Sequence, residues 1–145
     1  MKSLMPHLKL LACALLLALS GPVLGQNSGG TLLPSLARTG ATTVSADQTN
    51  VTGNAVHVIT DCSVFVSGTF TVTIQGKDPA SGKYYTLLTG AAIAGTGTQV
   101  LKVGRGLPAT ANVSANDILP TVWRVSVAGA STPSATFSVG FMVVE

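Results

Sequence analysis

The sequence predicts an all-β protein whose single domain is an antiparallel sandwich of two sheets. Three observations support this fold class. Charged residues make up only 9% of the chain, and Thr, Ser, Ala, Gly and Val dominate it, which is typical of β-structure. Apolar and polar residues alternate from residue 41 onward, and Gly, Pro, Asn and Ser separate the alternating runs. A length of 145 residues suits one hydrophobic core.

Residues 1–25 have the pattern of a secretory signal peptide. Two lysines flank the start of an apolar run from Leu10 to Leu19, and the small-residue site Val23-Leu24-Gly25 follows it. The run is too short for a membrane-spanning helix, which needs about 20 apolar residues. We therefore expect an exported chain that begins at Gln26 and keeps no stable membrane span. Retention of residues 1–25 as an anchor, or as an arm buried in a virion, is the alternative.

Removal of the signal leaves a nearly neutral chain with one cysteine. The formal charge is +3, and it falls to +1 without Lys2 and Lys9. The remaining cations are scattered singly, which argues against a nucleic-acid partner. Because Cys13 lies in the signal, Cys62 has no partner for an intramolecular disulfide. The core alone must hold the fold.

The first part of the mature chain is a flexible leader followed by a strand. Residues 26–40 contain Gly-Gly and a proline and show no sustained period, so we assign them as the leader and residues 41–145 as the domain. From Ala55 to Val66 the period is two, with a bulge or break expected near Asp61. This parity places Cys62 in the core.

A hairpin is predicted in the middle of the domain. Thr69 to Gln75 alternates bulky apolar residues with Thr and Gln, as in a half-buried antiparallel strand. Asp78 and Pro79 then occupy the first two positions of a turn, and Gly82 suits a left-handed closing position. The turn leads into a second strand over Tyr84–Leu88.

The remaining strands complete a sandwich of immunoglobulin-like type, with a jelly roll or a small barrel as the alternative. Gln99–Val103 is a short strand, Ala109–Pro120 an irregular crossing, and Val122–Val127 and Phe137–Val143 are strands with alternating apolar residues. The predicted core contains Phe70, Val72, Ile74, Trp123, Phe137, Val139 and Phe141.

The sequence predicts no catalytic residue. His57, Asp61 and Ser63 share one face of the same predicted strand, but His57 and Asp61 are about 13 Å apart in an extended chain, too far for a hydrogen bond. His57 is the only histidine of the mature chain. We therefore expect a protein that is not an enzyme.

No cofactor and no metal is predicted either. Residues 76–84 superficially resemble a phosphate-binding loop, but five residues separate the glycines where four are required, and a strand follows instead of a helix. Asp47, Asn50 and Asn54 surround Gly53 without the spacing of a calcium loop, so an Asx-type turn explains them better.

The stretch Ile74-Gln75-Gly76-Lys77-Asp78-Pro79-Ala80-Ser81-Gly82-Lys83-Tyr84-Tyr85-Thr86-Leu87-Leu88 resembles small proteins encoded among the virion genes of tailed bacteriophages. The resemblance continues through Leu119-Pro120, Trp123-Arg124-Val125 and Ser138-Val139-Gly140 and covers roughly residues 41–144. It implies a structural part, such as a capsid decoration or minor head protein with an immunoglobulin-like sandwich. An export signal departs from this pattern, because virions of this kind assemble in the cytoplasm.

We therefore expect a non-enzymatic structural or binding domain. Its partner would be a capsid or a surface protein, and whether it also forms homo-oligomers is left open. The alternative is a secreted module that binds a cell-surface glycan or protein. The expected location is outside the cell, with the virion as the alternative. The predicted partner contact is the hairpin tip, which comprises Lys77, Asp78, Pro79, Ser81, Lys83 and Tyr84.

Overall fold

A computed structural model describes residues 28–40 and 42–144, and these residues form strands and loops without a helix. The all-β prediction is therefore confirmed. The predicted signal segment and Gln26 lie outside the described residues. The strands are β1 (Ser28–Thr39), β2 (Thr42–Val44), β3 (Gln48–Thr49), β4 (Ala55–Lys77), β5 (Tyr84–Thr89), β6 (Gly97–Gly104), β7 (Ser114–Ala115) and β8 (Val122–Val144).

All eight strands belong to one hydrogen-bonded sheet. Its order is β1-β8-β4-β6-β7, while β2 and β3 also pair with β8, and β5 pairs with β4. The pairing is antiparallel except between β6 and β7. The sequence predicted two separate sheets, and this was wrong because β4 and β8 each continue through a bend where two separate strands were expected.

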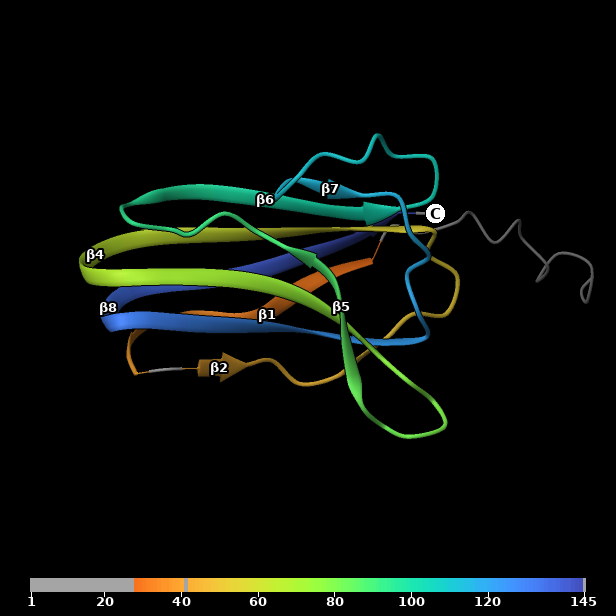
Figure 1. Cartoon of the computed structure of the whole chain (residues 1–145), viewed down its shortest axis with the longest axis horizontal. Helices are drawn as coiled ribbons and strands as arrows, with labels where there is room; N and C mark the ends of the chain where they lie inside the picture. Colours follow the sequence, from red (N-terminus) through yellow and green to blue (C-terminus); the bar gives the residue numbers. More distant parts are fainter. Residues whose placement is uncertain (1–27, 41, 145) are drawn as a thin grey trace, which may run out of the picture.

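The sheet folds back on itself, because β4 and β8 pair along their length and reverse direction together (Figure 1). If β8 were straight, Trp123 and Phe141 would lie about 60 Å apart. Their ring centroids are 5.4 Å apart, and those of Phe70 and Phe137 are 5.3 Å apart. Two halves of the sheet therefore face each other across the core.

We name the two halves after their edge strands. The β1 half consists of β1, β6, β7 and the sections 55–62 of β4 and 137–144 of β8. The β5 half consists of β2, β3, β5 and the sections 69–77 of β4 and 122–130 of β8.

The two bends fit against each other through one glycine. Gly68 of β4 has φ +75°, and a Cβ placed on it would lie 2.6 Å from Pro133 Cα and 2.7 Å from the Ala130 carbonyl oxygen. Ser131 and Thr132, at the tip of the β8 bend, also have positive φ values, of 58° and 50°. Non-glycine residues rarely adopt this conformation, so the bend is a constrained part of the backbone.

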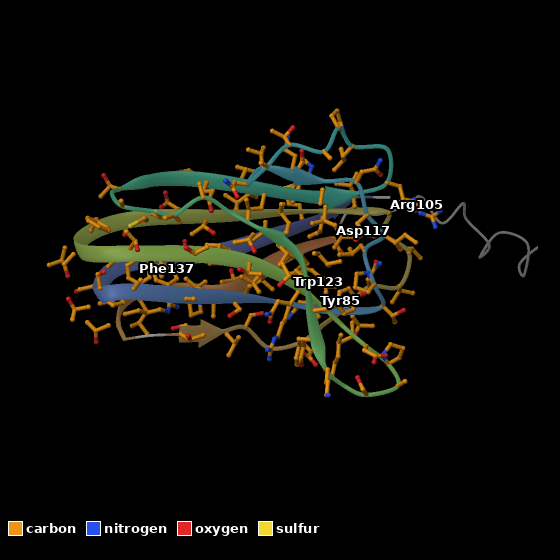
Figure 2. The ribbon with its side chains drawn as sticks, viewed as in Figure 1. Tyr85, Arg105, Asp117, Trp123 and Phe137 are labelled. Carbon is orange, nitrogen blue, oxygen red and sulfur yellow. The ribbon has the colours of Figure 1, made fainter. Side chains whose placement is uncertain are left out.

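The core lies between the halves and matches most of the prediction. Trp123 is fully buried, and Figure 2 shows it toward the end of the molecule opposite the bend, with Phe137 nearer the bend. Phe141 is only partly buried and packs against the core from its margin. The other predicted core residues, Cys62, Phe70, Val72, Ile74, Phe137 and Val139, are buried.

The prediction of a flexible leader over residues 26–40 was wrong from Ser28 onward. This stretch forms β1, which pairs with β8 and buries Leu32 and Leu33 in the core. Its irregular sequence reflects an irregular strand, because the register shifts between Thr31 and Leu33 and again between Leu33 and Leu36. Proline is tolerated at such positions of an edge strand.

Gly68→Ala should destabilise the protein more than Gly82→Ala, which is a matched control. Gly82 has a similar φ of +70° but open space around it, so its replacement should lower the free energy of unfolding by about 1–2 kcal/mol, the cost of the backbone conformation alone. Gly68→Ala adds overlap with Pro133, for a loss of roughly 3 kcal/mol. Urea unfolding measures both, and equal losses would contradict this account of the bend.

The Cys62 thiol should react only when the protein unfolds. Cys62 is 2% exposed, and burial raises the pKa of its thiol. A raised pKa lowers the fraction of the thiol present as the reactive thiolate. We expect Ellman's reagent to modify the native mature chain very slowly and the chain in concentrated urea at once. Rapid modification of the native chain would place Cys62 at the surface.

Candidate interaction site

The predicted hairpin tip is a tight turn stabilised by its own side chains. The Asp78 amide donates to the Lys83 carbonyl at 2.8 Å, and the Gly82 amide donates to the Asp78 carbonyl at 2.8 Å. The Asp78 carboxylate accepts hydrogen bonds from the Ser81 hydroxyl and from the Ala80 amide, and these bonds lower its pKa. Asp78 therefore shapes the turn, and the prediction of a β4–β5 hairpin is confirmed.

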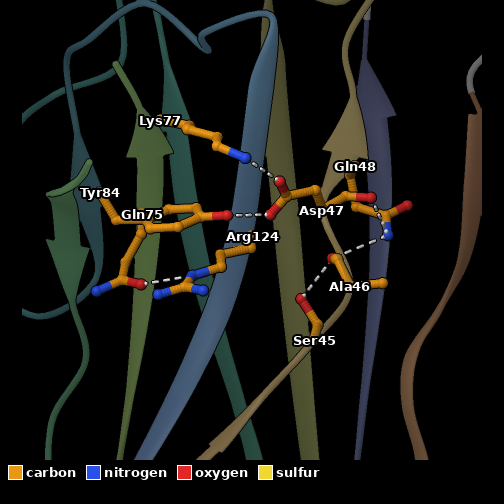
Figure 3. Close-up of polar contacts among 8 residues, drawn as sticks. All are labelled: Ser45, Ala46, Asp47, Gln48, Gln75, Lys77, Tyr84 and Arg124. Carbon is orange, nitrogen blue, oxygen red and sulfur yellow. Dashed lines mark hydrogen bonds and ion pairs between the residues drawn. The ribbon is translucent and has the colours of Figure 1, made fainter. Parts of the chain in front are cut away.

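Two further predicted contact residues, Lys77 and Tyr84, make contacts within the chain itself (Figure 3). The carboxylate of Asp47, between β2 and β3, lies 2.9 Å from Lys77 Nζ and accepts a hydrogen bond of 2.6 Å from the Tyr84 hydroxyl. The Tyr84 hydrogen bond, followed by that from Lys77, lowers the pKa of Asp47. The same contact with Asp47 raises the pKa of Lys77.

Arg124 and Gln75 extend this cluster across the sheet. The Arg124 guanidinium lies 3.3 Å from the centre of the Tyr84 ring, and its Nε donates to Gln75 Oε1 at 2.9 Å. We call these five residues the polar brace: Asp47, Gln75, Lys77, Tyr84 and Arg124. Because they come from β4, β5, β8 and the β2–β3 connection, the brace crosses the outer surface of the β5 half.

The most exposed aromatic side chain at the hairpin is Tyr85, which was not among the predicted contact residues. Tyr85 is 46% exposed and packs over Gly76, where a Cβ would lie 2.6 Å from the ring and 2.9 Å from Pro120. It lines a groove of about 580 Å³ together with Pro79 and Val122. Figure 2 shows Tyr85 close to Trp123, toward the end of the molecule opposite the bend.

The predicted tip is therefore divided by the structure. Pro79, Ser81 and Lys83 are exposed at the turn, whereas Lys77 and Tyr84 belong to the polar brace. Whether the exposed three contact a partner stays a prediction. The sequence contained one indication of the Tyr85 groove. Gly76 is directly opposite Tyr85 in the predicted hairpin, and a residue without a side chain leaves room for the tyrosine ring to lie over it.

Outside the brace, His57 and Asp61 contact neighbouring strands of the sheet. His57 lies opposite Lys102 on β6 and Met142 on β8, while Asp61 accepts a hydrogen bond from the Thr98 hydroxyl at 3.0 Å. Within residues 28–40 and 42–144, His, Cys, Asp and Glu form no group of three that could hold a metal ion.

The loop around Gly53 is closed by one side chain. The amide of Asn50 donates to the Gly53 carbonyl, and its oxygen accepts from the Gly53 amide. Asn50 therefore closes a turn as predicted, but its bond spans three residues where an Asx turn spans two.

No helix among the described residues is long and apolar enough to cross a membrane.

No protein-family model and no curated protein sequence matches this chain. Among solved structures, it is similar to a chain of Bacillus endospore appendages, described as a family of disulfide-linked pili, with 12% identity and a TM-score of 0.41 over 86% of this chain and 96% of that one. It is also similar to a chain of infectious bursal disease virus strain Gx, with 11% identity and a TM-score of 0.44 over 81% of this chain. That match spans only 32% of the viral chain. With both TM-scores below 0.5, we assign no family, and the fold rests on the strand pairing described above.

The polar brace should make stability depend on pH through Asp47. Because folding lowers the pKa of this carboxyl, its contribution is present above its ordinary value of 3.8 and disappears as the pH falls through the lowered pKa. Tyr84→Phe removes the largest cause of the lowering. Between about pH 5 and about pH 3, the unfolding temperature of this variant should fall less than that of the unmodified chain.

Tyr85→Phe is the matched control, since Tyr84 supplies the hydroxyl that binds Asp47. The effect should be small and should shrink in high salt, because the groups are near the surface. The same pH slope of the unfolding temperature in both variants would show that the Tyr84 hydroxyl does not stabilise the ionised Asp47.

Proposed function

We propose that this chain is a non-enzymatic structural domain built into a protein assembly, as a decorating or minor virion protein or as part of a comparable surface structure. The observation that carries this proposal is an apolar outer surface on the β1 half. We call it the apolar face, and it consists of Ile59, Val100 and Met142.

The strand register supports treating these side chains as one surface. Ile59 lies opposite Val100 on β6 and opposite Gly140 on β8. Val100 is 37% exposed and Met142 is 46% exposed, while Ile59 between their strands is half-buried. Gly140 leaves the centre of this surface flat, since a Cβ there would meet only the Gly30 carbonyl, at 3.5 Å.

The two outer surfaces of the sheet therefore differ in chemistry. The β5 half carries the polar brace, whose charges contact one another, whereas the outer surface of the β1 half places Ile59, Val100 and Met142 beside His57, Asp61 and Lys102, with no ion pair among these described residues. Apolar side chains that gather on one side of a small domain commonly mark a protein contact. The long edge strand β1 borders this surface and adds unpaired backbone groups, which also favour association.

The resemblance of residues 74–88 to virion proteins supports placing the assembly in a virion. The apolar run and small-residue site of residues 1–25 support export, which would place the assembly at the cell surface. Production of the full chain in a secreting bacterium tests export directly. The mass of the recovered protein should correspond to a chain that begins at Gln26.

Association through the apolar face can be tested on that recovered protein. Light scattering during gel filtration should show a mass that rises with concentration, and Val100→Lys should reduce the rise because a charge must then be desolvated at the contact. Val44→Lys is the matched control. Val44 is a 45% exposed valine on β2, in the other half of the sheet.

Equal effects of the two substitutions would contradict the assignment of this surface. A chain that stays monomeric at every concentration, and that is retained by immobilised glycans unless Tyr85 is replaced by Ala, would instead favour the alternative function. That alternative is a secreted binding module for a cell-surface glycan or protein, which would use the Tyr85 groove.

A further inference from the structure

We propose that β1 exchanges between copies of this chain, so that β1 of one copy pairs with β8 of the next and links the copies. This inference rests on the proposed function in an assembly and names the partner, which is a second copy. Four features of β1 carry it, namely its position, its hinge, the surface it covers and its internal bracing.

The position of β1 leaves it free to separate as a unit. It stands at the end of the sheet order and pairs with β8 alone among the described strands. The ladder runs from Ser28, opposite Val143, to Thr39, opposite Ser134. Separation therefore breaks one ladder and leaves the pairing of β8 with β4 intact.

The connection between β1 and β2 can act as the hinge. Thr39 is paired in the β1 half, whereas Thr42 lies opposite Ala128 in the β5 half, so the chain changes halves between these two residues. Gly40 has φ +119°, a conformation that residues with a side chain rarely adopt. If this short reversal straightens, β1 points away from its own β8, the arrangement that favours exchange.

The surface under β1 requires a replacement strand. Leu32 and Leu33 are 8% and 7% exposed and belong to the same core cluster as Phe137 and Val139. A copy that released β1 would expose this core and the free edge of β8. Only a strand that pairs with this edge and buries this core would restore the structure. The β1 strand of another copy can do both, because it has the same sequence.

The irregular shape of β1 makes this fit specific. The guanidinium of Arg38 donates to the Pro34 carbonyl at 2.7 Å and to the Leu36 carbonyl at 3.1 Å, which braces the section beside the register shifts from within. The same guanidinium donates to the Phe137 carbonyl and lies 4.4 Å from the centre of that ring. The internal bonds would travel with β1, and the contact with Phe137 would form again on the partner.

A disulfide trap tests the exchange. Thr31 and Gly140 are directly opposite across the β1–β8 ladder, on the outer surface, at a spacing that a disulfide can bridge. Thr31→Cys and Gly140→Cys chains are prepared separately, mixed in urea, refolded together at high concentration and oxidised. Exchange predicts a disulfide-linked heterodimer of the two variants well in excess of the 1:2:1 ratio of homodimer, heterodimer and homodimer that random pairing gives, measured by intact mass. The unmodified chain is the control, because its Cys62 is buried.

The hinge gives a second, directional readout. Gly40→Val should raise the yield of heterodimer several-fold, because valine disfavours the positive φ of the closed hinge. Gly95→Val, at an open loop position with no positive φ, should leave the yield unchanged.

The inference is overturned if the Thr31→Cys/Gly140→Cys double variant forms only the intramolecular disulfide and the mixed single variants form no excess heterodimer, with or without Gly40→Val. Association that persists in that case and responds to Val100→Lys would leave the proposed function standing while removing strand exchange. Formation of the heterodimer, together with an unmodified chain that shows no rise of mass with concentration, would support strand exchange and contradict the proposed function.

Discussion

The structure depends on one constraint, which is that β4 and β8 remain paired while both reverse direction. Two strands that bend separately would lose their ladder, so the bends must coincide and fit against each other. Gly68 makes this fit, because its missing side chain lets the β4 backbone approach Pro133 and the Ala130 carbonyl. The shared bend turns a single sheet into two layers and brings Phe70 against Phe137. The hydrophobic core is thus a consequence of this backbone contact as much as of the apolar pattern.

The polar residues of the domain follow from the same layered arrangement. On the outside of the β5 half, Asp47, Lys77, Tyr84 and Arg124 satisfy one another and tie neighbouring strands together. These contacts occupy the charged and hydroxyl groups of that surface with one another. The outside of the β1 half has no equivalent brace among its described residues and carries Ile59, Val100 and Met142 beside His57, Asp61 and Lys102. This difference is the basis on which we propose that the domain belongs to an assembly.

The local elements could be predicted from the sequence wherever alternation was strict. Phe70, Val72 and Ile74 alternate with threonines, and the turn at Asp78 contains the residues that such a turn requires, so both elements were correct. The bends could not be predicted, because a glycine within an apolar run reads as a break between two strands. Past Cys62 a register shift changes the parity, which is why Val64 is exposed although the alternation placed it inward. β1 was missed because its bulges hide the period.

The polar brace could not be predicted from the sequence either, since Asp47 is far along the chain from Lys77 and Tyr84.

The pairing of Ala55 with Val144 determines when this domain can form. The opening section of β4 finds its β8 neighbour only after the closing section of β8 has been synthesised. Topologies rich in such distant contacts fold slowly. A nascent chain of this design therefore cannot complete its sheet until residue 144 has left the ribosome.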